Sequence, residues 1–267
     1  MTGSEPQFIE VGTGEARRRI AYRRDAAPNN GKPGLFWLSG FKSDMASTKA
    51  VALAGYASES GVDCVRFDYS GHGVSDGPFE SGTIGRWLHE TESIFTQVSQ
   101  GPQIIVGSSM GGHMALMLLK RLMAHNPSEA SRIVALVLIA PAWDMTEELI
   151  WKRLPSEARR VLIEDGVYYQ PSTYGDPYPI TRALVEDGRS NLLARVPFNP
   201  GRPILILQGL QDTDVPASHV RALQSFLTGG HVHIAEVPDG EHRLSRPEDL
   251  ARLFALIEEA SIIKSSE

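Results

Sequence analysis

Short apolar runs alternate with segments of helical spacing along most of the chain. The apolar runs lie at 34–38, 62–69, 103–106, 133–140, 204–207 and 231–237, and the helical segments lie at 46–60, 83–98, 109–124, 216–228 and 247–263. Runs of this length are typical of strands that are buried on both faces. Residues 7–12 and 18–25 have the pattern of a leading hairpin. The sequence therefore predicts an α/β fold, with a mainly parallel central sheet covered by helices on both faces.

The alternation stops between residues 143 and 200. Helical spacing continues there in three pieces, at 145–154, 155–165 and 180–194, and no convincing central strand is present. A stretch rich in Tyr and Pro, YYQPSTYGDPYP, separates the last two pieces. Open α/β sheets bind ligands outside the carboxyl ends of their strands, where an insertion at this point is expected to lie. We therefore expect a core formed by 1–142 and 201–267, with 143–200 as a small helical lid.

The charge and hydropathy of the chain argue against two classes of partner. The formal net charge is −6 over 267 residues, and no basic stripe offsets it, which argues against nucleic acid. The cluster Arg17-Arg18-Arg19 is interleaved with Ile20 and Tyr22, as in the polar face of a strand. No apolar run approaches the length of a membrane span, and the N-terminal residues have neither the apolar nor the Arg-rich pattern of a targeting segment. The expected location is the cytoplasm.

The cysteine and metal-ligand patterns of the sequence indicate neither a disulfide nor a metal site. The chain has a single cysteine, Cys64, so no internal disulfide can form, and its apolar surroundings favour a buried thiol over a nucleophile. The carboxylates of Asp212 and Asp214 alternate as in a calcium loop, but the glycine and glutamate of such a loop are absent. We expect no metal and no organic cofactor. The sequence carries no prediction of the oligomeric state.

The strongest chemical signal is Gly107-Ser108-Ser109-Met110-Gly111, which stands between an apolar strand and an apolar helix. In that context the G-x-S-x-G pattern is typical of a nucleophile elbow, where small flanking residues let the strand and the helix cross closely. The helix N-terminus also directs its N–H groups and its positive dipole end at this point. We predict Ser109 as the nucleophile, and Ser108, one position off the motif, is the alternative.

The base must come from another segment, and His242 has the most informative position among the eight histidines. It follows the last predicted strand, in the turn just before the final helix. Folds with a nucleophile elbow place their triad in the chain order serine, acid, histidine, which predicts His242 as the base. His113 lies one turn after the serine on the same helix, and His72 lies in a loop after a strand, where a binding role is plausible.

The acid is expected after the strand that precedes this histidine. The segment from Gln208 to Pro216 offers two aspartates, Asp212 within the turn and Asp214 nearer the next helix. Asp214 has the position of a helix N-cap, so we favour Asp212 as the residue that orients the imidazole.

An oxyanion intermediate needs two converging backbone N–H groups. One follows the nucleophile, at Met110, and the other is expected in the loop after the strand at 34–38, at Phe41. Gly40, just before it, suits a backbone that must approach a substrate closely.

These motifs, taken together, resemble a known family. The segments LSGFKSDMASTKA, RFDYSGHGVSDG, GPQIIVGSSMGGHMALM, QGLQDTDVP and GEHRL are similar to those of the palmitoyl-protein thioesterases and acyl-glucuronide esterases of the α/β-hydrolase family. The resemblance runs from about residue 34 to the C-terminus and is weakest through 143–200. It implies the α/β-hydrolase fold, a triad of Ser109, Asp212 and His242, and hydrolysis of carboxylic esters or thioesters through an acyl-enzyme.

The substrate is expected to be a small molecule or an acylated partner, bound beneath the lid. Large side chains of the lid are candidates to line an acyl pocket: Trp143, Trp151, Leu154, Tyr168, Tyr169 and Tyr174. The alternative is a structural role, in which each of these side chains only packs the lid onto the core. A charge clamp for a carboxylate-bearing leaving group is a further hypothesis, with four candidate cations: Lys152, Arg153, Arg159 and Arg160. Other chemistry on the same triad (perhydrolase, C–C hydrolase or amidase) and a non-catalytic binding protein remain alternatives.

Overall fold

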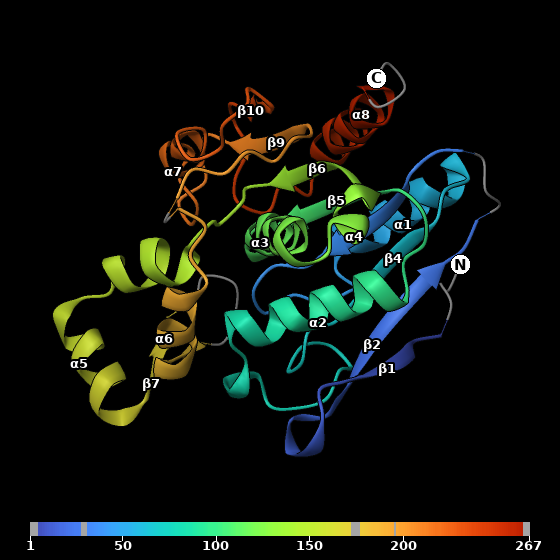
Figure 1. The fold of residues 1–267 in the computed structure, drawn as a ribbon. Helices are drawn as coiled ribbons and strands as arrows, with labels where there is room; N and C mark the ends of the chain where they lie inside the picture. The colour runs from blue at the N-terminus through green and yellow to red at the C-terminus, as the bar shows by residue number, and fades with distance from the viewer. Residues whose placement is uncertain (1–4, 28–30, 172–176, 195, 264–267) are drawn as a thin grey trace.

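The computed structural model describes residues 5–27, 31–171, 177–194 and 196–263, and its centre is an eight-stranded sheet (Figure 1). The strand order is β1-β2-β4-β3-β5-β6-β9-β10. These strands are β1 (Gln7–Val11), β2 (Arg18–Asp25), β3 (Gly34–Leu38), β4 (Cys64–Phe67), β5 (Gln103–Ser108), β6 (Ile133–Ile139), β9 (Ile204–Gly209) and β10 (Val232–Val237). β1 and β2 pair antiparallel, as do β2 and β4, and the other pairs are parallel. The predicted α/β-hydrolase fold is confirmed.

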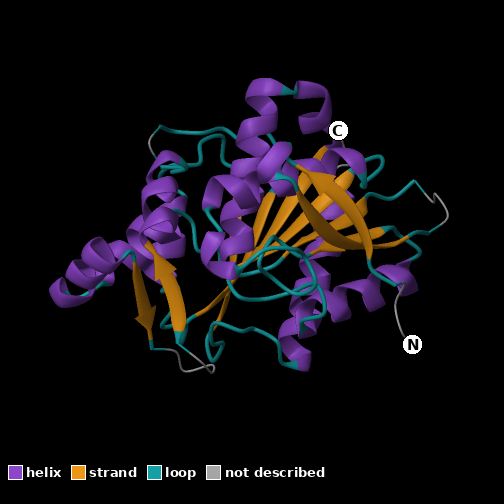
Figure 2. Ribbon diagram, turned by 90° about the horizontal axis from the view of Figure 1, so that it is seen from below, coloured by secondary structure: helices purple, strands orange, loops and turns teal. Residues whose placement is uncertain are grey.

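Helices cover both faces of this sheet (Figure 2). The helices are α1 (Thr48–Ser60), α2 (Ile84–Gln97), α3 (Met110–His125), α4 (Pro127–Arg132), α5 (Ser156–Asp165), α6 (Arg182–Ser190), α7 (Ala217–Leu223) and α8 (Pro247–Ile263), with short 3₁₀ turns η1 (Gly14–Ala16) and η2 (Phe79–Ser81). Buried residues of α1 and α8 form one apolar cluster with the sheet, and those of α2 and α3 form another on the opposite face. No helix in the described ranges is both long enough and apolar enough to cross a membrane.

Strand β3 shows why these runs fold as central strands. All five of its residues are buried, and its side chains alternate between the two faces of the sheet. Phe36 and Leu38 join the cluster of α2 and α3, whereas Leu35 and Trp37 join that of α1 and α8. A continuous apolar run therefore serves both layers, as expected for a strand buried on both faces.

The segment 143–200 leaves the sheet and forms a separate group of elements, with α5, β7 and α6 at one end of the molecule in Figure 1. Its order is a π-helical turn η3 (Thr146–Ile150), a 3₁₀ turn η4 (Trp151–Arg153), α5, β7 (Val167–Gln170), β8 (Tyr178–Thr181) and α6. β7 and β8 pair antiparallel with each other and with no strand of the central sheet. The sequence missed this hairpin, because Pro179 and its neighbours suggested only a loop, although proline is tolerated in an edge strand.

Two helix boundaries and one additional helix differ from the sequence prediction. The helix expected at 216–228 is shorter, because α7 ends at Leu223, and the one expected at 180–194 begins only after β8. The short helix α4 was not foreseen as an element of its own.

The turn from β5 to α3 is the tightest backbone crossing relevant to function. A Cβ atom added to Gly107 would lie 2.4 Å from the carbonyl oxygen of Gly111, and one added to Gly111 would lie 2.1 Å from that of Leu38. Both contacts are with backbone, which cannot rotate away as a side-chain tip can. The two glycines therefore let α3 start directly against β3 and β5.

We predict that Gly111→Ala lowers the free energy of unfolding by about 1–3 kcal/mol or more, because the new methyl group overpacks against the backbone of β3. Gly55→Ala is the matched control. Gly55 lies inside α1 with no atom within 4 Å of an added Cβ, and this change favours helix by roughly 0.5–1 kcal/mol. Urea unfolding followed by circular dichroism compares the two, and equal stabilities would contradict the close crossing.

Candidate active site

Ser109 lies at the turn between β5 and α3, in an unusual backbone conformation. Its φ and ψ are 55° and −117°, outside the regions that most residues occupy. Three backbone hydrogen bonds hold the turn: its own N–H donates to Ile139 at 2.8 Å, and its carbonyl accepts from Gly112 at 2.9 Å and from Ala142 at 3.0 Å. The conformation projects the serine away from the end of the strand, as a nucleophile elbow requires.

His242 and Asp212 lie within hydrogen-bonding distance of this serine. The Nε2 atom of His242 is 3.1 Å from the hydroxyl oxygen of Ser109, and its Nδ1 atom is 2.8 Å from Oδ2 of Asp212. The carboxylate of Asp212 is fully buried, and its other oxygen accepts N–H groups from Asp214 at 2.9 Å and Val215 at 2.8 Å. The carboxylate is therefore held in one orientation by its own loop and in turn orients the imidazole.

The two alternative residues are placed differently. Ser108 is the last residue of β5 and is buried, and the imidazole of His242 is hydrogen-bonded to Ser109. The position of Asp214 in the sequence suggested the N-cap of the following helix. This expectation is wrong, because the N-cap of α7 is Pro216. The carbonyl of Asp214 instead accepts a hydrogen bond from Arg153 at 2.9 Å.

The loop after β3 passes directly over the serine. A Cβ atom added to Gly40 would lie 3.4 Å from that of Ser109, so Phe41 and its N–H follow within one residue of this close approach. Met110, the other predicted oxyanion donor, is the first residue of α3. The loop and the helix start thus both lie next to Ser109.

His72 supports this loop through a hydrogen bond, whereas its position in the sequence suggested a binding role. Its Nε2 atom accepts the N–H of Lys42 at 3.2 Å, while its Nδ1–H donates to the carbonyl of Ser70 at 3.2 Å. Burial lowers the pKa of His72 to about 4, so the ring is neutral near pH 7. A neutral ring with this tautomer fixes the backbone one residue beyond Phe41.

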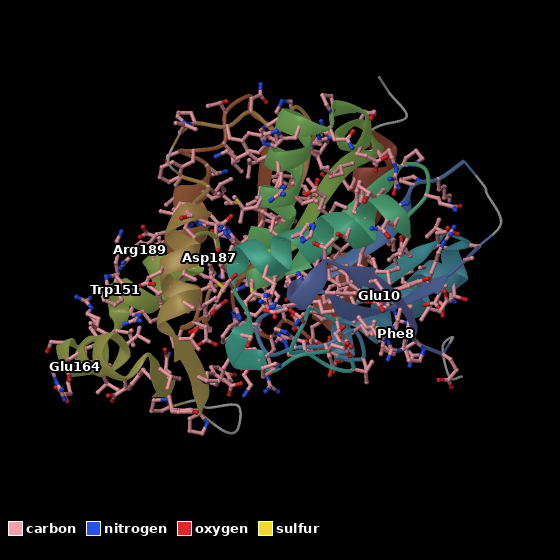
Figure 3. All side chains as sticks on the ribbon, turned by 60° about the horizontal axis from the view of Figure 1, so that its bottom comes forward. Phe8, Glu10, Trp151, Glu164, Asp187 and Arg189 are labelled. Carbon is pink, nitrogen blue, oxygen red and sulfur yellow. The ribbon has the colours of Figure 1, made fainter. Side chains whose placement is uncertain are left out.

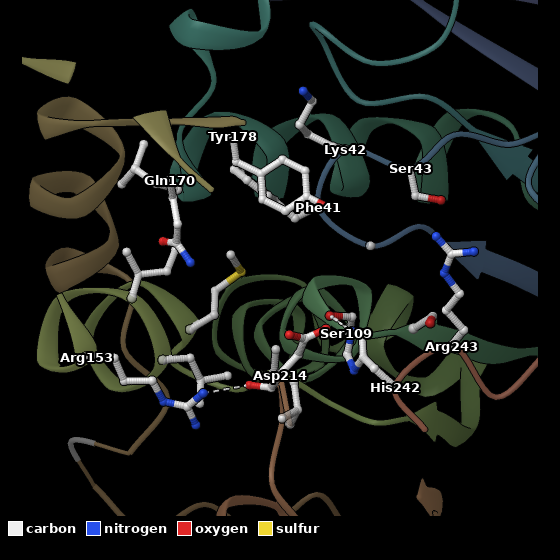
Figure 4. Close-up of a pocket in the computed structure, with 18 of the residues that line it drawn as sticks. Phe41, Lys42, Ser43, Ser109, Arg153, Gln170, Tyr178, Asp214, His242 and Arg243 are labelled. Atoms are coloured by element: carbon white, nitrogen blue, oxygen red, sulfur yellow. Dashed lines mark hydrogen bonds between the residues drawn. The ribbon is translucent and has the colours of Figure 1, made fainter. Parts of the chain in front are cut away.

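A cavity of about 790 Å³ opens at Ser109 and extends in two directions (Figure 4). Toward the segment 143–200 its lining is mostly apolar, with Met145, Leu149, Ile150 and Leu154. In the other direction its lining is polar, with Ser43, Lys49, Arg243 and Ser245 among others. In Figure 4, Ser109 and His242 lie between Tyr178 on one side and Arg243 on the other.

The β7–β8 hairpin supplies one wall of the apolar end. Tyr168 pairs with Ile180 and Gln170 pairs with Tyr178, and all four residues line the cavity. Tyr169 lies between the two lining positions of β7 and is 57% exposed, because successive side chains of a strand point to opposite sides. Tyr178, Gln170 and Ile180 were missed in the sequence. The signal that could have found them is the alternation of side chains along each strand, in Tyr168-Tyr169-Gln170 and in Tyr178-Pro179-Ile180.

Two of the predicted acyl-pocket residues, Trp143 and Trp151, lie outside the cavity lining. Trp143 stacks on His219, with ring centroids 4.4 Å apart, and its indole N–H donates to the carbonyl of that histidine at 2.8 Å. Trp151 lies under the guanidinium groups of Arg159 and Arg189, 5.3 Å and 4.7 Å from its ring, and Figure 3 shows it beside Arg189 at the outer edge of the molecule. Both indoles therefore serve the packing of the segment 143–200, and neither lines the cavity. The sixth candidate, Tyr174, lies outside the described residues.

Among the four basic candidates of this segment, Arg153 lines the cavity. The other three have partners along their own segment: Lys152 bonds Glu148, Arg160 bonds Glu157 and Glu164, and Arg159 donates to the carbonyls of Trp151 and Lys152. They thus support the local helices and turns.

Asp212, Asp214 and His242 also place ligand-type atoms within 4.8 Å of one another, a spacing that suits a cation. Both carboxylate oxygens of Asp212 already accept hydrogen bonds, and both ring nitrogens of His242 face protein groups. The donor set is therefore committed to the hydrogen-bond chain, which fits proton transfer better than metal binding. A site without a metal stays a prediction.

Comparison with known proteins identifies relatives of this chain. The sequence profile described as "Alpha/beta hydrolase family" matches residues 30–253. The palmitoyl-protein thioesterase ABHD10, mitochondrial, of Homo sapiens is 31% identical over 230 residues, which cover 85% of this chain and 72% of that protein. The crystal structure named "Putative hydrolase from Agrobacterium vitis S4" has 41% identity and a TM-score of 0.92, covering 96% of this chain and 98% of the other. Alpha/beta hydrolase domain-containing protein 10 from mouse has 28% identity and a TM-score of 0.83, covering 99% and 100%. The cytoplasmic location stays a prediction.

The buried thiol of Cys64 gives a test of which nucleophile is accessible. Cys64 is in β4, and burial raises its pKa to about 12, so it carries almost no thiolate near pH 7. We predict that iodoacetamide leaves the native protein unlabelled and its activity unchanged, while the protein in 8 M urea takes up about one label. Intact-mass spectrometry measures both. Rapid labelling of the native protein with loss of activity would contradict a serine as the only reactive nucleophile in the site.

Proposed function

The chain belongs to the α/β-hydrolase family, and we propose that it hydrolyses carboxylic esters or thioesters through an acyl-enzyme formed on Ser109. The observation that carries this proposal is the continuous pair of hydrogen bonds from Ser109 through His242 to Asp212. A serine, an imidazole and a buried carboxylate in this order form a proton-transfer chain that makes a hydroxyl nucleophilic.

In the acylation step, the hydroxyl oxygen of Ser109 attacks the carbonyl carbon, and its proton passes to Nε2 of His242. The N–H groups of Phe41 and Met110 donate to the oxygen that becomes negatively charged. The bond from carbon to the leaving oxygen or sulfur then breaks, and His242 donates its proton to that atom. Asp212 stabilises the charged imidazole between these two transfers.

In the deacylation step, His242 takes a proton from water, and the resulting hydroxide attacks the acyl carbon. The second tetrahedral intermediate uses the same two N–H donors. Its collapse breaks the bond to Ser109, which regains its proton from His242, and the carboxylic acid leaves.

The segment 143–200 is proposed as the lid that receives the acyl chain. The cavity beneath it is lined by Met145, Leu149, Ile150 and Leu154, and its volume lies within the range of small-molecule sites. Each methylene buried there contributes up to about 0.8 kcal/mol of binding. The relatives described as palmitoyl-protein thioesterases support an acyl chain and a thioester as substrates.

We predict that Ser109→Ala lowers the kcat for a butyryl thioester by about 10⁴-fold or more, because it removes the hydroxyl that is bonded to the base. Ser108→Ala is the control, since this serine is buried at the neighbouring position, and it should cost far less. Thiol release measures the rate, and a fluorophosphonate probe should label the wild type and Ser108→Ala but not Ser109→Ala. A non-catalytic binding protein would show neither turnover nor labelling. Exchange of the two phenotypes would place the nucleophile at Ser108.

We predict that Asp212→Asn lowers kcat by about 10³–10⁴-fold, because an amide at this position favours the wrong imidazole tautomer. The loop should persist in this variant, since the amide oxygen can still accept the N–H groups of Asp214 and Val215. Asp214→Asn is the matched control and should retain most of the rate, because Asp212 makes the bond to the imidazole. The same thioester assay compares them, and a greater loss at Asp214 would reverse the assignment of the acid.

A further inference from the structure

The carboxylate of Asp144 joins the two ends of the segment 143–200. The side chain is buried, and its backbone φ of 50° lies in the left-handed region, which aspartate tolerates better than most residues. Its Oδ1 atom accepts the N–H of Leu193 at 2.6 Å, and its Oδ2 atom accepts that of Ala194 at 3.1 Å. These donors lie 49 and 50 positions further along the chain, so one side chain closes the base of the whole segment.

His113 connects this base to the helix that carries the candidate nucleophile. It lies in α3, one turn after Ser109, and is buried. Its Nδ1 atom accepts the N–H of Asp144 at 3.2 Å, and its ring also forms a hydrogen bond with the backbone of Asn191. Burial lowers the pKa of His113, so the ring is neutral near pH 7 and has one acceptor nitrogen and one donor nitrogen for these two bonds. The start and the end of the segment are therefore both bonded to one side chain of α3.

Close packing at the same place adds to these hydrogen bonds. A Cβ atom added to Gly188 of α6 would lie 2.1 Å from Oγ1 of Thr146 in η3, so the two ends of the segment cross with no room for a further side chain. The N–H of Ala142 donates to the carbonyl of Ser109 at 3.0 Å. The base of the segment thus lies directly beside the elbow.

The apolar wall of the cavity begins at this base. The carbonyl of Asp144 accepts the N–H groups of Glu147 and Glu148, at 3.1 Å and 2.9 Å, and so holds the start of η3. The residues of η3, and the one before it, that line the cavity are Met145, Leu149 and Ile150. A shift of Asp144 would therefore move this wall relative to Ser109.

We propose that Asp144 and His113 are positioning residues that set the acyl-chain selectivity of the site. They hold both ends of the lid on α3 and so fix the distance of the apolar wall from Ser109. The inference rests on the proposed function, which places the acyl chain beneath the lid. Neither side chain is among the described residues that line the cavity, so each acts through Met145 and the residues of η3.

The test uses two thioesters of N-acetylcysteamine, one hexanoyl and one acetyl, and measures the ratio of their kcat/KM values. The two substrates share one neutral leaving group and differ by four methylenes, each worth up to roughly fourfold when it is buried. We expect a ratio of about thirty or more in the wild type and a roughly tenfold lower ratio in Asp144→Asn, since the amide has a single oxygen for two N–H donors. The loss should lie mainly in the KM for the hexanoyl thioester, because a displaced wall weakens binding of the chain in the ground state and the transition state alike.

A second variant and a matched control separate this role from general destabilisation. His113→Asn keeps an acceptor near the position of Nδ1 but loses the bond to Asn191, so it should lower the ratio in the same direction and by less. Asp63→Asn changes a carboxylate just before β4, at the opposite, amino end of the sheet, where it accepts the N–H of Ala27 at 2.6 Å, and it should leave the ratio unchanged. All rates are measured below the unfolding temperature of each variant.

An unchanged ratio in both Asp144→Asn and His113→Asn, a wild-type ratio near one, or an equal fall in Asp63→Asn overturns the positioning role. If Asp144→Asn does not fold, the ratio in His113→Asn decides alone. Failure of the proposed function gives a different result, because the wild type then hydrolyses neither thioester and is not labelled by the fluorophosphonate probe.

Discussion

The strained turn at Ser109 is the feature on which the rest of the site depends. A non-glycine residue in this conformation costs on the order of 1–3 kcal/mol, and it persists only where the surroundings over-determine it. Here the neighbouring strand β6 accepts its N–H through Ile139, and the glycines at 107 and 111 remove the Cβ atoms that would separate β5 from α3. Sheet packing thus holds the serine in place before any substrate binds.

The sequence predicted those parts of the candidate site that are encoded in short local patterns. The elbow is one such pattern, because its glycines and its strand and helix are contiguous in the chain. Asp212 and His242 were predicted from their places after β9 and β10, since parallel strands bring their carboxyl ends to one edge. The fold followed from the apolar runs for the same reason: burial on both faces leaves a simple signature.

The lining of the cavity could not be read in this way, because it depends on directions within irregular elements. Tyr168 and Tyr169 are chemically alike and adjacent, yet only the former lines the cavity, and the choice follows from the register of β7 against β8. Trp143 is a large apolar residue at the start of the same segment, but stacking on His219 turns it toward α7. The pairing of Lys49 with the loop of Arg243 spans 194 positions of sequence, which no local pattern encodes.

The hydrogen bond from Lys49 to the carbonyl of Arg243 connects the loop of the catalytic base to the core. Lys49 extends from α1, whose apolar face packs with α8 against the sheet, and its ammonium group bonds the backbone carbonyl just after His242. The loop that carries the base is therefore tied to a rigid layer of the core.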